Sequence, residues 1–233
     1  MDTNTLVMAI WLPIAIVAIV QASFSLSISV LTLLSGVSLA NHRVKRGHGA
    51  LMTSYVAGSV VVTLALLAGL AWMFRTTGWS DNDFVLMVLI SALMTAGFAV
   101  LLFYYRYDPK GTRLWLPRRF AERIYAATKR AGSVDRSFLL GGMAVLLEIV
   151  FIIFPMTIAA YIASSMTGPA YYLALIVYTV IAVAPQIALA IAYARGYKVG
   201  AIQRWREQNK RFLQITAGIL MITLSIYLLT YVA

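Results

Sequence analysis

The chain has 233 residues, of which 61% are hydrophobic and only 12% are charged, and its net charge is +11. Soluble domains are usually about 45–50% apolar and about 25% charged, so this composition indicates a single membrane domain spanning residues 1–233. The sequence contains no cysteine, which excludes disulfides, thiolate metal sites and thiol redox chemistry.

Six apolar runs are each long enough to cross a bilayer as a helix. A hydrocarbon core of about 30 Å requires about 20 apolar residues per helix. The first run has no Lys or Arg before it and is longer than the core of a signal peptide, so we expect it to be retained. The runs are approximately Leu12–Ala40, Leu51–Phe74, Phe84–Tyr105, Phe138–Ser164, Tyr171–Ala194 and Leu213–Val232.

A polar stripe runs through the first of these segments. The stretch "SFSLSISV" at 23–30 alternates polar and apolar residues, as a strand would. A strand in the bilayer would leave its backbone unpaired unless it closed a barrel, so we expect a helix. One face of that helix carries Gln21, Ser25, Ser29 and Thr32, with Gly36 one turn further as a candidate hinge. The stripe is interpreted either as packing between helices or as one wall of a polar pathway.

The basic residues lie almost entirely in three of the five loops. Loops 41–49, 106–137 and 195–212 hold 18 of the 19 Lys and Arg residues. The second loop has a single basic residue, Arg75, and the loop 165–170 has no charged residue. By the positive-inside rule, we expect the three basic loops to face the cytoplasm and both termini to face outward. Because the charges cluster between apolar runs, they do not indicate a nucleic-acid partner.

The basic loop 106–137 contains the pattern of an interfacial helix. In "PRRFAERIYAATKRAG" (117–132), apolar and basic residues fall on opposite faces of a helix. Such a helix lies on an anionic leaflet, which predicts membrane lipids as partners. We interpret the contact as topological anchoring, and the alternative is a regulatory lipid site. The residues expected at the lipid interface are Arg118, Arg119, Arg123, Lys129 and Arg130.

The chain also divides into two similar halves, residues 6–105 and 138–233. "IVAIVQASF" (16–24) can be laid on "MAVLLEIVF" (143–151), which pairs Gln21 with Glu148. The tripeptide Thr-Ala-Gly that ends at Gly97 recurs ending at Gly218. Because each half has an odd number of spans, the second copy would be inverted, and such repeats place a transport site at the midplane. The alternative is a six-helix bundle with accidental similarity.

Glu148 is the only carboxylate within a predicted span. A charge at the centre of a membrane helix costs roughly 2.5–3.5 kcal/mol on insertion scales, so we interpret Glu148 as a proton carrier or a counter-charge for a cation. The alternative is a protonated Glu that bonds a neighbouring helix. Pro155 follows in the same span, and Pro185 directly precedes Gln186 in the next one. Since proline kinks a helix, we expect hinges at both prolines and Gln186 in the pathway.

The residue types that enzymatic or metal chemistry would need are missing from the predicted spans. No His, Asp or Cys lies within the predicted spans, and the two histidines share one short loop. We therefore expect no enzymatic activity, no cofactor and no metal site.

The final span, "RFLQITAGILMITLSIYLL" (211–229), is similar to the closing span of the lysine-exporter superfamily, where a basic and aromatic lead precedes glycine and an aliphatic run. The six-span 3+3 layout and the long basic third loop also resemble that superfamily, which includes the thiol transporters of cytochrome biogenesis. Those transporters carry cysteines in spans one and four, and relatives that move manganese or calcium carry paired acidic motifs there. This chain has only Glu148, opposite Gln21. The resemblance therefore implies efflux of a small polar or amino-acid-like solute across a bacterial or archaeal plasma membrane.

The sequence thus predicts an all-α polytopic membrane protein with six transmembrane helices in a 3+3 inverted repeat. We expect a secondary transporter or exporter, coupled to protons through Glu148, and compatible with a homo-oligomer. The alternative is a non-transporting subunit or accessory protein that binds lipid or a partner through its basic loops. The residues expected to line the pathway are Gln21, Ser25, Ser29, Thr32, Glu148 and Gln186.

Overall fold

A computed structural model describes most of the apolar part of the chain. The described residues are 3–24, 48–80, 82–103, 105–106, 113–114, 133–195, 205 and 208–232. Within these ranges the helices are α1 (Thr3–Phe24), α3 (His48–Thr76), α4 (Asp83–Phe103), α6 (Val134–Ser165), α7 (Pro169–Ala194) and α9 (Lys210–Val232). Two strands of two residues each, β1 (Tyr105–Arg106) and β2 (Arg113–Leu114), form an antiparallel pair between α4 and α6.

The helices have the length and composition of membrane spans. Among the described residues, α3, α4, α7 and α9 can each cross a bilayer, and α6 is a fifth span if its two bent halves are counted together. The described part of α1 has a shorter apolar stretch, Ile10–Ser23. The fold is therefore that of a helical membrane protein, with four or five of the six predicted spans present in the described residues. The predicted stretch from Ser25 to Ala40 lies outside them.

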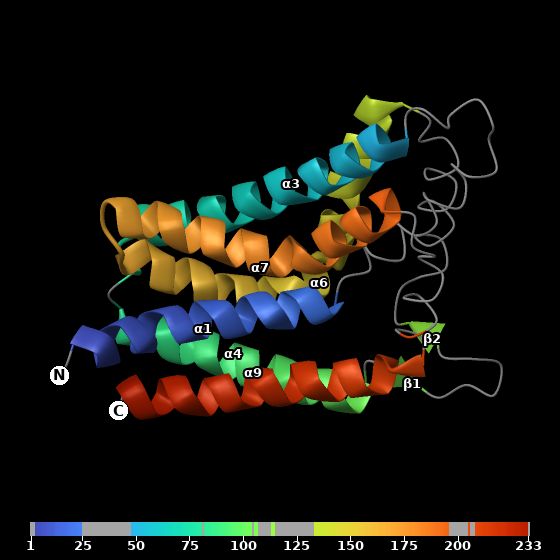
Figure 1. Cartoon of the computed structure of the whole chain (residues 1–233). Helices are drawn as coiled ribbons and strands as arrows, with labels where there is room; N and C mark the ends of the chain where they lie inside the picture. The colour runs from blue at the N-terminus through green and yellow to red at the C-terminus, as the bar shows by residue number, and fades with distance from the viewer. Residues whose placement is uncertain are drawn as a thin grey trace.

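The helices form a bundle in which most of the packed helix pairs include α6 or α7. α3 packs against α6 and α7, α1 packs against α6, α7 and α9, and α4 packs against α9 and α6. The helix ends that flank the three basic segments lie at one end of the bundle, which we call the basic end (Figure 1). Both termini and the two short connections lie at the opposite end (Figure 1).

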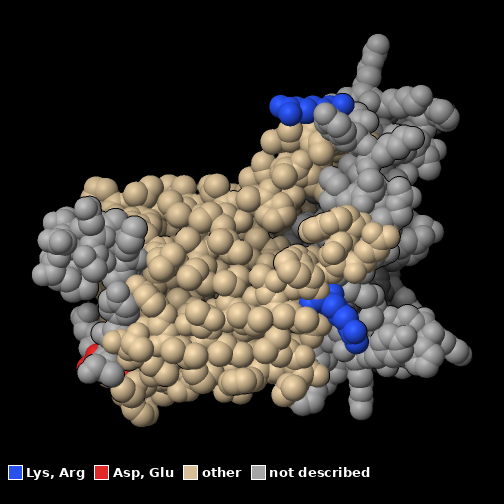
Figure 2. Space-filling model, turned by 60° about the horizontal axis from the view of Figure 1, so that its bottom comes forward, with Lys and Arg blue, Asp and Glu red and all other residues tan. Residues whose placement is uncertain are grey.

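Many large apolar side chains lie on the described surface of the bundle. Large apolar side chains such as Phe84, Leu102 and Leu139 are exposed. Figure 2 shows the middle of one face without charge, with described basic side chains toward one end and acidic ones toward the other. An uncharged apolar girdle of this kind suits contact with lipid rather than water.

Two apolar clusters fill the interior. The main core takes buried side chains from every helix, among them Ile14, Leu67, Ile90, Ile152, Tyr178 and Met221. A second cluster joins α3, α6 and α7 near the basic end, and we call it the satellite cluster. Its buried members are Met52, Tyr55, Leu140, Ala144 and Leu189.

Helices α3 and α6 cross with their backbones in direct contact. The hydroxyl of Ser54 donates to the Val134 carbonyl at 2.6 Å, and that of Ser137 donates to the Leu51 carbonyl at 2.6 Å. Each serine is three residues beyond the acceptor on its own helix, so the two bonds are reciprocal. Small residues at a helix crossing allow this close approach in membrane proteins. The crossing fixes the first half of α6 against α3.

Helices α4 and α9 meet at a second reciprocal crossing, centred on glycine. A Cβ added to Gly97 would lie 3.1 Å from the Gly218 carbonyl oxygen, and one added to Gly218 would lie 3.1 Å from that of Gly97. The next neighbours are also equivalent, since Gly97 faces Ile222 and Gly218 faces Leu101, each four residues beyond the opposite glycine. These are the glycines that the sequence comparison paired.

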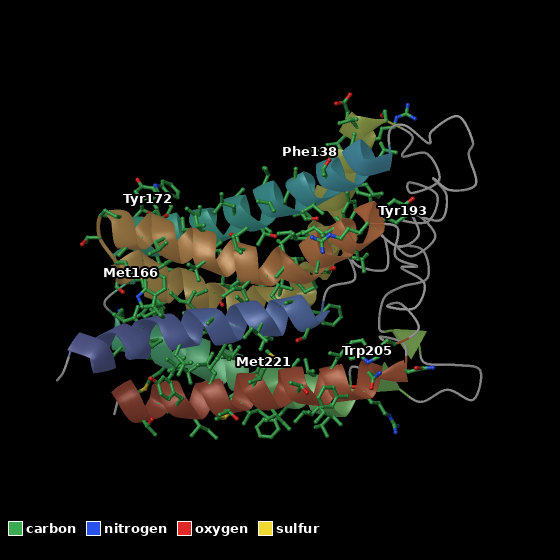
Figure 3. All side chains as sticks on the ribbon, in the orientation of Figure 1. Phe138, Met166, Tyr172, Tyr193, Trp205 and Met221 are labelled. Atoms are coloured by element: carbon green, nitrogen blue, oxygen red, sulfur yellow. The ribbon has the colours of Figure 1, made fainter. Side chains whose placement is uncertain are left out.

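A clamp around Arg75 closes the end of the bundle that holds the termini. Arg75 Nε donates to the Ser164 carbonyl at 2.9 Å, and a second guanidinium nitrogen donates to the Met166 carbonyl. The guanidinium carbon lies 4.1 Å from the centre of the Tyr171 ring. Met166 and the neighbouring Tyr172 mark this end in Figure 3. The clamp therefore joins the end of α3 to the turn between α6 and α7.

Candidate functional site

Glu148 lies inside the bundle at a sharp bend of α6. Its side chain is only 2% exposed. The axis of α6 turns by 90° between Val134–Ile149 and Phe151–Ser165, so Glu148 sits in the last turn before the bend. Figure 1 shows the first part of α6 descending from α3 and the second part running beside α7.

The position of this bend has a physical cause in Pro155. Proline has no N–H to donate to the carbonyl four residues earlier, and its ring crowds that carbonyl. For Pro155 that residue is Phe151, where the second half of α6 begins. The bend in span four thus lies one turn before Pro155. Helix α7 instead runs through Pro185 as one helix from Pro169 to Ala194.

Gln186 faces the interior from α7 with 3% of its surface exposed. It lies three residues before Leu189, which belongs to the satellite cluster together with Leu140 and Ala144 of α6. The first half of α6 descends from α3, and α7 runs toward the basic end (Figure 1). One turn beyond Ala144 on α6 is Glu148, and about one turn back from Leu189 on α7 is Gln186. Glu148 and Gln186 therefore each lie about one turn from a member of the satellite cluster.

Gln21 is also buried, at 4% exposure, but it has a different partner. The hydroxyl of Tyr178 donates to Gln21 Oε1 at 2.5 Å, which ties α1 to α7. Tyr178 is eight residues from Gln186, or about 12 Å along the helix axis at about 1.5 Å per residue. The buried polar groups therefore occupy two depths along α7, with Gln186 nearer the basic end.

Sequence reasoning missed Tyr178 and two buried polar residues of α3, Ser59 and Thr63. A tyrosine in an apolar run gives no signal of its own, although its hydroxyl usually finds a partner when buried. Ser59 donates to the Gly141 carbonyl at 3.1 Å and belongs to the α3–α6 crossing. Thr63 lies on the same side of α3, one turn further on. The spacing of these two residues on an otherwise apolar helix was the available signal.

One described buried side chain, that of Glu148, is acidic or basic. Among the described residues with buried side chains, Glu148 is the only acid, and none is Lys, Arg or His. No group of three or more His, Cys, Asp or Glu in the described ranges is placed to hold a metal ion. The arrangement can therefore bind or carry a proton or another cation, and offers no buried cationic side chain to an anion.

Several predicted site residues fall outside the described ranges. They are Ser25, Ser29, Thr32 and Gly36 of the polar stripe, and Arg118, Arg119, Arg123, Lys129 and Arg130 of the interfacial helix. Among the pathway residues that are described, Glu148 and Gln186 each lie about one turn from the satellite cluster, and Gln21 accepts a hydrogen bond from Tyr178.

Comparison with protein-family models, with characterised proteins and with solved structures finds no match to this chain. The functional argument therefore depends on the geometry of the bundle and on the chemistry of its buried side chains.

Proposed function

We propose that the protein is a secondary transporter that exports a small polar or amino-acid-like solute, with proton coupling through Glu148. The observation that carries this proposal is the position of Glu148. A carboxyl group is costly inside a membrane bundle, and this one lies buried at a 90° bend. Bent or broken helices beside polar groups are where transporters of this general kind bind their substrates.

The arrangement of helices supports two inverted halves of three spans each. If α1, α3 and α4 are exchanged with α6, α7 and α9, the contact between α3 and α6 becomes that between α7 and α1. The contact between α1 and α9 likewise becomes that between α6 and α4. All four contacts are present. The reciprocal Gly97–Gly218 crossing lies where the axis of such a repeat would pass.

An orientation follows from the same proposal. The helix ends at the basic end flank loops that hold nearly all of the Lys and Arg residues, so this end is assigned to the cytoplasm. Both termini and the Arg75 clamp would then face outward. Contacts at the clamp would have to open to release a solute to the outside, as in other alternating-access transporters.

The lysine-exporter superfamily remains the architecture that this layout resembles. The resemblance adds an expectation of efflux and of a plasma-membrane location. The described interior carries one acid rather than the paired acids of cation-exporting relatives, so an organic solute is favoured over a divalent metal.

The test is solute flux in vesicles that contain the purified protein. We expect at least one solute of a panel of amines, amino acids and small neutral polar compounds to move in response to a pH gradient. The Glu148→Gln variant keeps the shape of the side chain but cannot exchange a proton. Its pH-driven flux should fall by about 100-fold or more, because positioned proton-transfer groups typically contribute about 10²–10⁴-fold. Asp83→Asn, at the exposed start of α4, is the matched control and should retain flux.

Two results would count against the proposal. Unchanged pH-driven flux in Glu148→Gln would remove the coupling role. A wild-type protein that moves no solute of the panel, and that co-purifies with a stable partner, would favour the accessory role instead.

A further inference from the structure

Thr63, near the middle of α3, holds a buried hydroxyl that has no hydrogen-bond partner among the described residues. Its side chain is 0% exposed. Other helical threonines bond the carbonyl one turn back, as Thr95 does to Ser91 and Thr179 does to Leu175. A buried hydroxyl without a partner loses its hydration with no compensation. The Thr63 hydroxyl is therefore a polar group that no described residue satisfies.

The face of α3 that carries Thr63 continues from the satellite cluster, which joins α3 to α6 and α7. Met52 and Val56 belong to or pack on the satellite cluster, which includes Leu189 of α7. Residues 52, 56, 59 and 63 follow one face of a helix. α3 begins at the basic end and α7 ends there, so the two helices run in opposite directions (Figure 1). The path from the satellite cluster away from the basic end therefore leads forward to Thr63 on α3 and backward to Gln186 on α7.

The first half of α6 reaches the same place. A Cβ on Gly142 would lie 2.8 Å from Val62 Cγ2, so the neighbour of Thr63 touches α6 at Gly142. Leu140 and Ala144 belong to the satellite cluster, and Glu148 continues their helical face by one more turn. Thr63, Glu148 and Gln186 therefore each continue a helical face that starts in the satellite cluster, on three helices.

We propose that Thr63, Glu148 and Gln186 form one binding site for a primary ammonium group, an inference that rests on the transport function proposed above. A primary ammonium has three N–H donors and no acceptor. The three side chains offer a carboxylate oxygen, an amide oxygen and a hydroxyl oxygen, which are three acceptors from three helices. The carboxylate balances the positive charge of the ligand.

The same site disfavours a ligand that also carries a carboxylate. No Lys, Arg or His is buried among the described residues, so a second, negative group would meet no cationic partner among the described buried side chains. The substrate class assigned to the site is therefore an organic amine without a carboxylate, rather than an amino acid.

Binding can be measured on the purified protein without any transport. Methylammonium is the smallest probe of the proposed class, glycine adds a carboxylate, and tetramethylammonium keeps the charge but has no N–H donor. A ligand that binds only the folded protein raises its Tm. We expect methylammonium to raise the Tm of the wild type, and glycine and tetramethylammonium to have no effect at the same concentration.

The Thr63→Val variant tests the hydroxyl. Valine keeps the shape of the side chain, so its affinity for methylammonium should be roughly tenfold weaker or worse, as expected for a lost hydrogen bond to a charged group. Without ligand, its Tm should equal or exceed that of the wild type, because no internal bond is lost. Thr179→Val, whose hydroxyl bonds its own helix, is the matched control and should bind methylammonium as the wild type does.

Three results would overturn the site. They are no methylammonium response in the wild type, an unchanged response in Thr63→Val, or a Tm of Thr63→Val that falls without ligand, which would show a structural role. The outcome is separable from that of the proposed function. Binding that requires Thr63 without flux in vesicles would overturn transport alone, and flux of other solutes without methylammonium binding would overturn the ammonium site alone.

Discussion

The α3–α6 and α4–α9 crossings are both reciprocal and both built on glycine, but they differ in what each glycine meets. At the first crossing, a Cβ on Gly141 would overlap the backbone carbonyl of Tyr55, and one on Gly58 would overlap that of Phe138. At the second crossing, the nearest atoms to a Cβ on Gly218 belong to the Leu101 side chain, at 2.6 and 2.7 Å. A side chain can rotate away, whereas a carbonyl of a helix cannot.

The difference indicates which part of the bundle is fixed. The α3–α6 crossing holds the first half of α6 rigidly, up to the turn that carries Glu148 and the bend. The α4–α9 crossing has neighbours that can adjust. If α6 changes shape during transport, the motion is therefore expected in its second half and in the helices packed on it, and not between α3 and the first half of α6.

The largest effect is expected for Gly141→Ala. The added methyl group must push two backbones apart, and overpacking of this kind typically costs about 1–3 kcal/mol, occasionally more. We expect a cost at the upper end of this range, measured as a drop in Tm during thermal unfolding in detergent. Gly58→Ala should cost about the same, because it makes the equivalent contact on the other helix.

A control for this prediction is Gly69→Ala on the same helix. A Cβ at Gly69 would meet nothing within 4 Å, so this variant should be neutral or slightly stabilising. If Gly141→Ala were as stable as Gly69→Ala, the backbone contact between α3 and α6 would be wrong.

A smaller effect is expected for Gly218→Ala. The new methyl group displaces Leu101, and moving a side chain off its preferred rotamer costs of order 0.5–1.5 kcal/mol. Truncating the neighbour should relieve the clash, so Gly218→Ala should cost little in a Leu101→Ala background. A thermal-unfolding double-mutant cycle measures this coupling. Equal costs in both backgrounds would contradict the contact.

Much of the helical architecture could be predicted from the sequence. The boundaries of α3, α4, α6, α7 and α9 agree with the apolar runs to within four residues at each end. The Thr-Ala-Gly repeat paired Gly97 with Gly218, which meet in the structure. Hydropathy and short motifs can predict helix boundaries and such glycine pairs, because these features depend on local composition. The first run was predicted as Leu12–Ala40, but its helix begins earlier, at Thr3.

The rest depends on contacts between distant residues. The spacing of Ser54 and Gly58 is visible in the sequence, but nothing in it names Val134 and Phe138, each 80 residues further along the chain, as the residues that they meet. The burial of Glu148 was expected from its position in an apolar run. Its place before a bend could not be deduced, because the bend lies one turn before Pro155 and not at the proline itself. Thr63 differs from other helical threonines only through what surrounds it.

The smallest effects are expected for the two serines of the fixed crossing. Ser54→Ala removes one hydroxyl that donates to the Val134 carbonyl, and Ser137→Ala removes its counterpart to Leu51. Hydrogen bonds between membrane helices average about 0.6 kcal/mol in double-mutant cycles, so each variant should lower stability by about that amount. Because the two bonds are reciprocal but separate, the double variant should cost the sum. A cost near that of Gly141→Ala for either serine would mean that hydrogen bonding, and not the approach of the two backbones, holds α3 against α6.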